Sequence, residues 1–407
     1  MSKIHRGDRP QDGEPLSAGR VEYLEQARQR VRGRRIRRTA LVVIVLAVII
    51  AFTTGFVGSS ITWLKDVVDT VQIALRPSAG WPQQTGIQEL TALESMSGSF
   101  VELGSDGCVV YSLDGNRLNS IQSGYARPAL AVGKNRFVLY NRSGNELRVE
   151  SRTQNLYTKT MENSIYLCAM AEDGQLAVVT DDVNSMALVT VFSNKMDQLL
   201  TWSVTSAEGI PLRMKFSPDS SRLALANVTS DSGQLTANLY VLSLSQGEPV
   251  NIGSAASVPQ WMGWLSNDTV LVVYEDRAVL YGANGSGEKA SYDFGGSSLV
   301  SVSQEDSGVA LLLSAGQVCS AVLLDRNLKV QYGGNVLSAH EIVRANGKFY
   351  LLTDSTVECF AQSGEFQWNQ VLSARPQGLV TSGKQLLVLS GNTVQVLTPP
   401  EQSASGQ

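Results

Sequence analysis

One short pattern recurs eight times between residues 97 and 397 and limits the folds available to the chain. The pattern is a β-hairpin, in which two runs rich in apolar residues flank a turn containing Gly, Asn, Asp or Ser. The hairpins begin at Phe100, Arg136, Gln175, Arg222, Thr269, Gly308, Lys348 and Gln385. Successive starts are 36, 39, 47, 47, 39, 40 and 37 residues apart, which is the period typical of propeller blades.

A further short strand precedes each hairpin, and another follows most of them. Examples are PALAVG from Pro128, LRMKFS from Leu212 and EFQWNQVL from Glu365. Four strands per unit predict an all-β fold, a β-propeller with eight blades favoured and seven also compatible, because such blades must stack and the ring must close to remove its open edges. The last unit lacks an outer strand, so we expect a segment near Gln88 to Val101 to close the ring.

A long apolar stretch near the N-terminus predicts one transmembrane helix ahead of the propeller. Residues 39–64 carry no charge, and about 20 apolar residues in a helix span a bilayer core. Seven arginines between Arg28 and Arg38 precede this stretch, so the positive-inside rule leaves the N-terminus in the cytoplasm and the propeller outside it. A cleaved signal peptide is the alternative. The long basic flank, the length of the apolar run and the absence of an A-x-A site favour an uncleaved signal-anchor.

These features divide the chain into five parts and predict a single-pass protein of the cell membrane. They are a basic cytoplasmic tail (1–38), a transmembrane helix in contact with lipid (39–64), a stalk and linker (65–88), the propeller (89–398) and a disordered tail (399–407). The stalk is expected to continue the membrane helix before Pro77 breaks it. Small residues at Ala51, Gly55 and Ser59 would let a second copy pack against the helix as a homodimer, although small residues are common in membrane helices.

Two stretches of the repeat region resemble known propellers. The run FSPDSSRLALA from Phe216 resembles the motif of TolB-like and WD40-like propellers, and VECFAQSGEFQWN from Val357 is similar to PQQ-like repeats. As a whole, the chain resembles an uncharacterised Firmicutes family of single-pass, membrane-anchored β-propellers, a domain of unknown function. That resemblance implies a bacterial cell-surface location and brings no known activity.

The sequence contains few residues that could carry out catalysis. His340 is the sole imidazole of the predicted outer part, and we expect it to have a structural role. The four cysteines, Cys108, Cys168, Cys319 and Cys359, lack metal-binding spacing, and their pairing as disulfides stays open. Acidic pairs such as Asp181/Asp182, Glu275/Asp276 and Glu305/Asp306 fall in predicted turns. We therefore predict no catalytic residue, no metal and no cofactor.

The favoured function is an interaction scaffold that binds another protein or an envelope polymer. Trp261, Trp264 and Tyr274 are candidate binding residues, with core packing as the alternative role for each. The residues after 38 carry 22 Lys/Arg against 32 Asp/Glu, a balance that argues against nucleic acid as a partner of the propeller. Two other functions stay open, namely a carbohydrate hydrolase or lyase that uses carboxylates at the channel mouth, and a ligand sensor.

Overall fold

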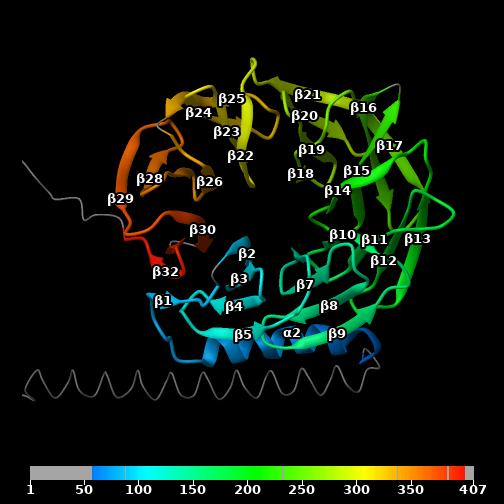
Figure 1. Cartoon of the computed structure of the whole chain (residues 1–407), viewed down its shortest axis with the longest axis horizontal. Helices are drawn as coiled ribbons and strands as arrows, with labels where there is room; N and C mark the ends of the chain where they lie inside the picture. The colour runs from blue at the N-terminus through cyan, green and yellow to red at the C-terminus, as the bar shows by residue number, and fades with distance from the viewer. Residues whose placement is uncertain (1–56, 88, 232, 337, 383–384, 399–407) are drawn as a thin grey trace, which may run out of the picture. The chain divides into compact units, whose positions relative to one another are not determined.

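The repeats form eight blades around a central axis (Figure 1). The computed structural model describes residues 57–87, 89–231, 233–336, 338–382 and 385–398. Each blade is an antiparallel sheet of four strands. The eight hairpins are the second and third strands of the blades, so the predicted repeat and the count of eight are confirmed.

The first four blades follow one another in chain order. Blade 1 contains β2 (Leu90–Met96), β3 (Ser99–Gly104), β4 (Cys108–Ser112) and β5 (Arg117–Ile121). Blade 2 contains β6 (Pro128–Val132), β7 (Arg136–Asn141), β8 (Glu146–Ser151) and β9 (Asn155–Thr160). Blade 3 contains β10 (Ile165–Met170), β11 (Leu176–Thr180), β12 (Ala187–Phe192) and β13 (Gln198–Val204). Blade 4 contains β14 (Ile210–Phe216), β15 (Arg222–Asp231), β16 (Gln234–Ser243) and β17 (Pro249–Ala255).

The remaining blades repeat the pattern until the last one. Blade 5 contains β18 (Trp261–Ser266), β19 (Thr269–Val273), β20 (Arg277–Gly282) and β21 (Gly287–Asp293). Blade 6 contains β22 (Ser298–Glu305), β23 (Gly308–Ala315), β24 (Val318–Asp325) and β25 (Val330–Val336). Blade 7 contains β26 (Glu341–Ala345), β27 (Lys348–Leu352), β28 (Thr356–Ala361) and β29 (Phe366–Val371). Blade 8 contains β30 (Pro376–Ser382), β31 (Gln385–Ser390), β32 (Thr393–Val396) and β1 (Gln83–Gln84).

The core lies between neighbouring blades. Val179 of blade 3, for example, packs in one buried cluster with Met214 and Leu225 of blade 4. The middle strands are buried along their whole length, as in β11 and β27 apart from Lys348, because both faces of each blade are covered by a neighbour. This explains why the hairpin strands read as nearly continuous apolar runs.

The ring is closed by a shorter segment than the sequence suggested. Strand β1 pairs with β32 through Gln83 and Gln84, whereas residues 88–101, expected to close the ring, lead into the first two strands of blade 1. The correction follows from the pairing: β2 is the inner strand that blade 1 needs beside β3. A pair of glutamines carries no strand signal of its own, so tertiary contacts define this strand.

Aromatic packing and backbone hydrogen bonds support the closing segment. The ring of Trp81 lies 5.9 Å from that of Phe100 and 6.0 Å from that of Tyr111, and its indole nitrogen donates to the Leu113 carbonyl at 2.8 Å. Gly80 donates its amide to the Asp114 carbonyl at 3.0 Å. Gly115, which follows Asp114, has φ +85°, and a Cβ on Gly115 would lie 2.3 Å from the carbonyl oxygen of Gly80. Only glycine therefore allows the two backbone segments to come this close.

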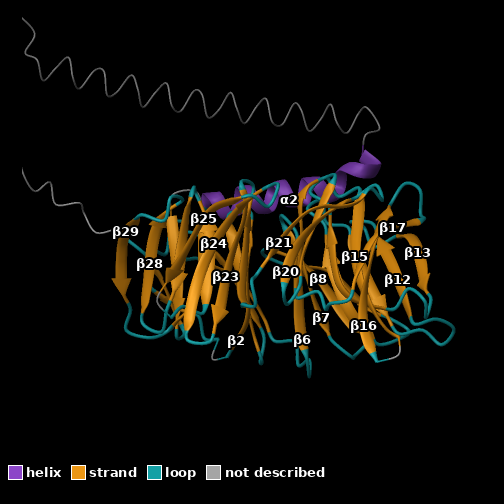
Figure 2. Ribbon diagram, turned by 90° about the horizontal axis from the view of Figure 1, so that it is seen from above, coloured by secondary structure: helices purple, strands orange, loops and turns teal. Residues whose placement is uncertain are grey.

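The disc has two faces that differ in what they carry. We call proximal the face formed by the turns between first and second strands and between third and fourth strands, and distal the opposite face. Helix α2 (Val57–Leu75) lies along the proximal face from Asp66 onward (Figures 1 and 2). Within the residues predicted as a stalk and linker (65–88), the structure has the docked part of this helix and the closing strand.

Two arginines of blade 2 hold α2 in place. Arg152, 2% exposed, donates to Asp69 at 3.1 Å and to the hydroxyl of Thr70 at 2.6 Å. Arg136 forms an ion pair with Asp66, with its Nη2 at 3.0 Å from Oδ2. Each guanidinium also donates to a backbone carbonyl of a neighbouring blade, that of Ser97 for Arg152 and that of Asn194 for Arg136. The helix is thus bound to blades 1, 2 and 3 together.

The N-terminal predictions fall largely outside the described residues. Among the residues described, no helix is long and apolar enough to cross a membrane. The basic tail (1–38), most of the predicted membrane helix (39–64), the first part of its small-residue stripe and the tail 399–407 lie outside them.

A buried carboxyl group lies where the ends of the ring meet. Glu102 of β3 is fully buried, and within the described residues neither of its carboxyl oxygens has a hydrogen-bond partner. Burial raises the pKa of Glu102 to about 7, and the nearby hydroxyl of Thr85 lowers it only in part. The uncharged form is therefore the one that suits the folded state.

We expect Asp69→Ala to destabilise the propeller by about 3–5 kcal/mol, because it leaves the buried Arg152 cation without its acid. Urea unfolding of the full chain in detergent measures the loss. The matched control is Asp268→Ala. The side chain of Asp268 is 81% exposed in its ion pair with Arg222, so the loss of this pair should cost less than about 1 kcal/mol. Equal losses in the two variants would contradict the structural role of the buried pair.

We expect Glu102→Gln to stabilise the propeller increasingly as pH rises. The pKa of Glu102 is raised from 4.5 to about 7 in the fold, so the stability linked to its protonated form is complete below about pH 4.5 and lost as pH rises through 7. Between pH 5 and 8 the wild type should lose about 2–3 kcal/mol that the glutamine variant retains. Urea unfolding at both pH values tests this, and a difference between the proteins that does not change with pH would contradict it.

Candidate functional site

One pocket on the distal face combines an apolar floor with arginines. It has a volume of about 480 Å³ and lies where the inner strands β2 and β6 of blades 1 and 2 begin. We call it the arginine pocket. Its lining residues are Thr91, Ala92, Leu103, Arg127, Pro128, Ala129, Leu130 and Arg142.

Backbone hydrogen bonds bring the two arginines of this pocket together. The amide of Arg142 donates to the carbonyl of Arg127 at 2.9 Å, and the amide of Arg127 donates to the side-chain oxygen of Asn141 at 3.2 Å. Ser143, next to Arg142, has φ +64° in the β7–β8 turn. The turn therefore folds back on the start of β6 and places both exposed arginines at the pocket.

A third arginine adds its charge from blade 4. Arg213 of β14 donates from Nε to the carbonyl of Gln260 at 3.0 Å. The pKa of Arg213 is lowered by burial first and by the charge of Arg142 second, so the two cations lie close enough to repel each other. Among the described residues, no ion pair joins Arg127, Arg142 or Arg213 to an acid.

A second distal pocket contains one of the candidate binding residues. It has a volume of about 530 Å³ and is lined by Gln260, Trp261, Glu275 and residues 298–302 at the start of β22. Gln260 donates to Glu275 at 3.2 Å. Trp261 is partly exposed here, so the indole ring is accessible to a ligand.

The other two candidate binding residues lie in the core. Trp264 is 4% exposed and donates to the carbonyl of Lys215 at 3.0 Å. Tyr274 is fully buried, with its hydroxyl 3.1 Å from that of Tyr281. Burial, followed by the neighbouring Tyr281, raises the pKa of Tyr274. Both side chains pack in the cluster between blades 4 and 5, so the structure does not bring them to the pocket of Trp261.

Several titratable groups of the inner strands have shifted pKa values. His340 lies beside the carbonyl of Pro376, with Nε2 at 2.9 Å from the oxygen, and burial lowers the pKa of His340. Burial raises the pKa of Glu341 to about 7. Desolvation by the surrounding strands also raises the pKa of Glu94, although its side chain is exposed, while Lys215 lowers it in part. The sequence analysis did not identify Glu94 and Glu341 because desolvation by neighbouring strands raises their pKa values, and no local sequence pattern shows this.

The acidic pairs and cysteines have structural surroundings. Glu305 accepts from the Asn346 amide at 2.7 Å and lies 3.7 Å from Arg344, which ties blades 6 and 7 together. All four cysteines have free thiols. Burial raises the pKa of the Cys108 thiol to about 12, with Glu150 and Glu102 adding to the effect. Among the described residues, no group of three His, Cys, Asp or Glu side chains could hold a metal ion.

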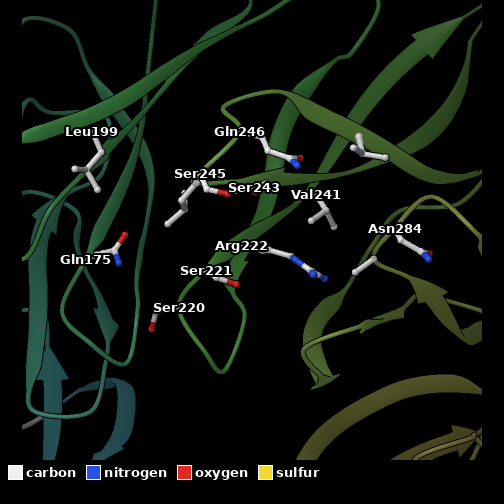
Figure 3. Close-up of a pocket in the computed structure, with 13 residues that line it drawn as sticks. Gln175, Leu199, Ser220, Ser221, Arg222, Val241, Ser243, Ser245, Gln246 and Asn284 are labelled. Carbon is white, nitrogen blue, oxygen red and sulfur yellow. Dashed lines mark hydrogen bonds between the residues drawn. The ribbon is translucent and has the colours of Figure 1, made fainter.

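A third hollow lies on the proximal face over blade 4 (Figure 3). This outer groove has a volume of about 750 Å³ and extends from Gln175 and Leu199 of blade 3 to Asn284 beyond β20 of blade 5. Its lining mixes hydroxyl and amide groups with apolar side chains such as Val250, which is 42% exposed. The one cation in the lining, Arg222, already lies 3.2 Å from Asp268. The groove suits contact with an uncharged polar surface.

Comparison with known proteins identifies the family. A family model described as a family of unknown function (DUF5711) matches residues 81–398. The chain belongs to this family. The match begins at Trp81, so it includes the closing strand β1 as well as all eight blades. No curated protein matches the chain.

Solved structures with the same fold come from proteins of diverse origin. BamB from Moraxella catarrhalis superposes with a TM-score of 0.52 at 11% identity over 78% of this chain and 98% of its own. Sqt1 from Chaetomium thermophilum, bound to the N-terminus of the ribosomal protein L10, has a TM-score of 0.54 at 14% identity, over 77% of this chain and 98% of its own. The computationally designed protein Ika8 has a TM-score of 0.55 at 12% identity, over 77% and 99%. At these identities the likeness shows the propeller fold alone.

We expect Glu341 to exchange its proton near pH 7, because burial raises the pKa of Glu341 to about that value. Carbodiimide coupling to glycine ethyl ester, read by peptide mass spectrometry across pH 4–8, should show the reactive protonated form of Glu341 disappearing around pH 7. Asp182 is the internal control, because its hydrogen bond from Ser185 lowers the pKa of this exposed carboxyl. A Glu341 midpoint at or below pH 5 would contradict the assigned burial effect.

Proposed function

We propose that this protein is a membrane-anchored scaffold whose propeller binds a partner protein outside the cytoplasm. The proposal rests on one observation: helix α2 and the two candidate binding pockets lie on opposite faces of the propeller. Helix α2, which begins at Val57 inside the apolar stretch 39–64, is fixed to the proximal face from Asp66 onward, while the arginine pocket and the pocket of Trp261 open on the distal face. Attachment and binding can therefore occur without competing for the same surface.

The exposed side of α2 supports the anchoring part of the proposal. Val68, Val71 and Leu75 are 47%, 49% and 78% exposed and recur at helical spacing, on the side away from Asp69 and Ile73. An apolar stripe of this kind suits the headgroup region of a bilayer. With the basic segment before residue 39 in the cytoplasm, the propeller would lie outside with its proximal face toward the lipid.

The pocket linings support binding of a protein more than of a sugar polymer. The distal pockets join apolar side chains such as Leu130 and Trp261 to a few charged groups, and pockets of this composition and size are typical of specific recognition. A propeller likeness to Sqt1, crystallised with a peptide segment of a ribosomal protein, agrees with that use of the fold. An envelope polymer remains an alternative ligand.

One observation favours a second function. The raised pKa of Glu341 would let its carboxyl group act as a proton donor near neutral pH, as the acid of a carbohydrate hydrolase or lyase must. If the protein is such an enzyme, Glu341→Gln should abolish cleavage of cell-wall glycan by the full chain. We favour the scaffold because the distal pockets lie at other inner strands than Glu341.

Labelling of single engineered cysteines tests the orientation. In a Cys319→Ser background, which removes the one native cysteine that is not buried, Val183→Cys on the β11–β12 turn (90% exposed) should react with a membrane-impermeant maleimide on intact cells. Ser2→Cys should react only after permeabilisation. Val71→Cys should be protected in membranes and react in detergent. Labelling of residue 2 but not of residue 183 on intact cells would overturn the proposal.

A further inference from the structure

The arginine pocket has an unbalanced charge that the fold does not explain. The residues after 38 carry ten more acidic than basic groups. Arg127 and Arg142 nevertheless line one pocket, Arg213 lies near Arg142, and no acid forms an ion pair with any of the three among the described residues. Like charges held close together raise the free energy of the empty site. A bound anion would relieve this repulsion.

The side chains of the two pocket arginines are available for such a ligand. The contacts that fix the loop use the main-chain amides of Arg127 and Arg142 and the carbonyl of Arg127. Both side chains are exposed, and the guanidinium of Arg142 also lies beside the hydroxyl of Tyr140. Arg213 differs, because its guanidinium donates to the carbonyls of Gln260 and Leu212. Arg127 and Arg142 could therefore bind a ligand directly, while Arg213 adds positive potential. Guanidinium groups suit carboxylates, which accept two parallel hydrogen bonds.

The floor of the pocket restricts what carries the anion. Four apolar residues form this floor, namely Leu103, Pro128, Ala129 and Leu130. The hydroxyl of Thr91 donates its proton to the Leu103 carbonyl at 3.0 Å. The floor is therefore largely apolar. A glycan or polyphosphate presents hydroxyl and phosphate groups along its whole length. A peptide with an acidic residue beside an apolar one matches both parts of the lining.

We propose that the arginine pocket binds a partner protein through an exposed acidic peptide segment, with the carboxylate held by Arg127 and Arg142 and a neighbouring apolar side chain on the floor of the pocket. This proposal rests on the scaffold function and names the chemistry of its partner. The pocket volume of about 480 Å³ is in the range of specific ligand sites. Because the pocket opens on the distal face, docking of α2 leaves it free.

Selection from a phage-displayed library of random heptapeptides, on the full chain in detergent, provides the probe. The enriched sequences should pair Asp or Glu with Leu, Ile, Val or Phe. This preference should disappear on the double variant Arg127→Gln/Arg142→Gln. It should persist on the charge-matched control Arg117→Gln/Lys289→Gln, which changes exposed cations on the outer strands β5 and β21.

An enriched peptide labelled with fluorescein then allows a double-mutant cycle by fluorescence anisotropy. The Arg127→Gln/Arg142→Gln variant should bind it at least tenfold more weakly, as should the wild type when the acid of the peptide is changed to its amide. The two changes together should weaken binding no further than either alone, because both remove one interaction. Arg127→Lys/Arg142→Lys, which keeps the charge, should lose less, and thermal unfolding of each variant shows whether the fold is intact.

The outcomes separate this inference from the scaffold function. If no peptide is enriched on the wild type, both proposals fail. If peptides are enriched but bind the Arg127→Gln/Arg142→Gln variant equally well, the scaffold function stands and the arginine pocket is not its site. If poly(glycerol phosphate) displaces the peptide at equal concentration of anionic groups, the pocket recognises anionic polymer and the assignment to protein is wrong.

Discussion

Closure of the ring by two residues is the constraint on which the rest of the structure depends. Every other blade takes its four strands from one continuous segment, but blade 8 completes its sheet with β1, more than 300 residues away in sequence. The pairing of Gln83 and Gln84 alone is weak, so Trp81 packing against Phe100 and Tyr111 must contribute much of the stability of the seam. An open ring would expose the edge of β32 and the apolar faces of blades 1 and 8.

Some of the buried charged groups lie in blades 1 and 2 and connect the closing segment with the attachment of helix α2. Arg152 and Asp69 fix α2, the carbonyl of Ser97 ties that pair to blade 1, and Glu102 lies in the same blade behind the closing segment. The segment from α2 to β1 is therefore held at both of its ends.

How much the sequence could predict depended on whether the signal was local. The eight hairpins were recognisable because a blade buried on both faces needs apolar strands, as β11 shows. The closing strand was assigned to the wrong residues because Gln83 and Gln84 have no strand pattern, and the docking of α2 was missed because Asp69 meets Arg152 only in three dimensions. Among the candidate binding residues, Trp261 reaches a pocket, whereas Trp264 and Tyr274 have the core role that was weighed as the alternative.

The arginine pocket illustrates why binding sites on a propeller are difficult to read from one sequence. The three arginines of this region, Arg127, Arg142 and Arg213, belong to two blades and lie as many as 86 positions apart in sequence. Because the residues after 38 are acidic overall, neither composition nor spacing identifies these arginines. The ring geometry brings the starts of all inner strands to one face, and charges that are dispersed in sequence become neighbours there. A propeller can therefore change its ligand by substitutions at strand starts while the hairpins that hold it together stay the same.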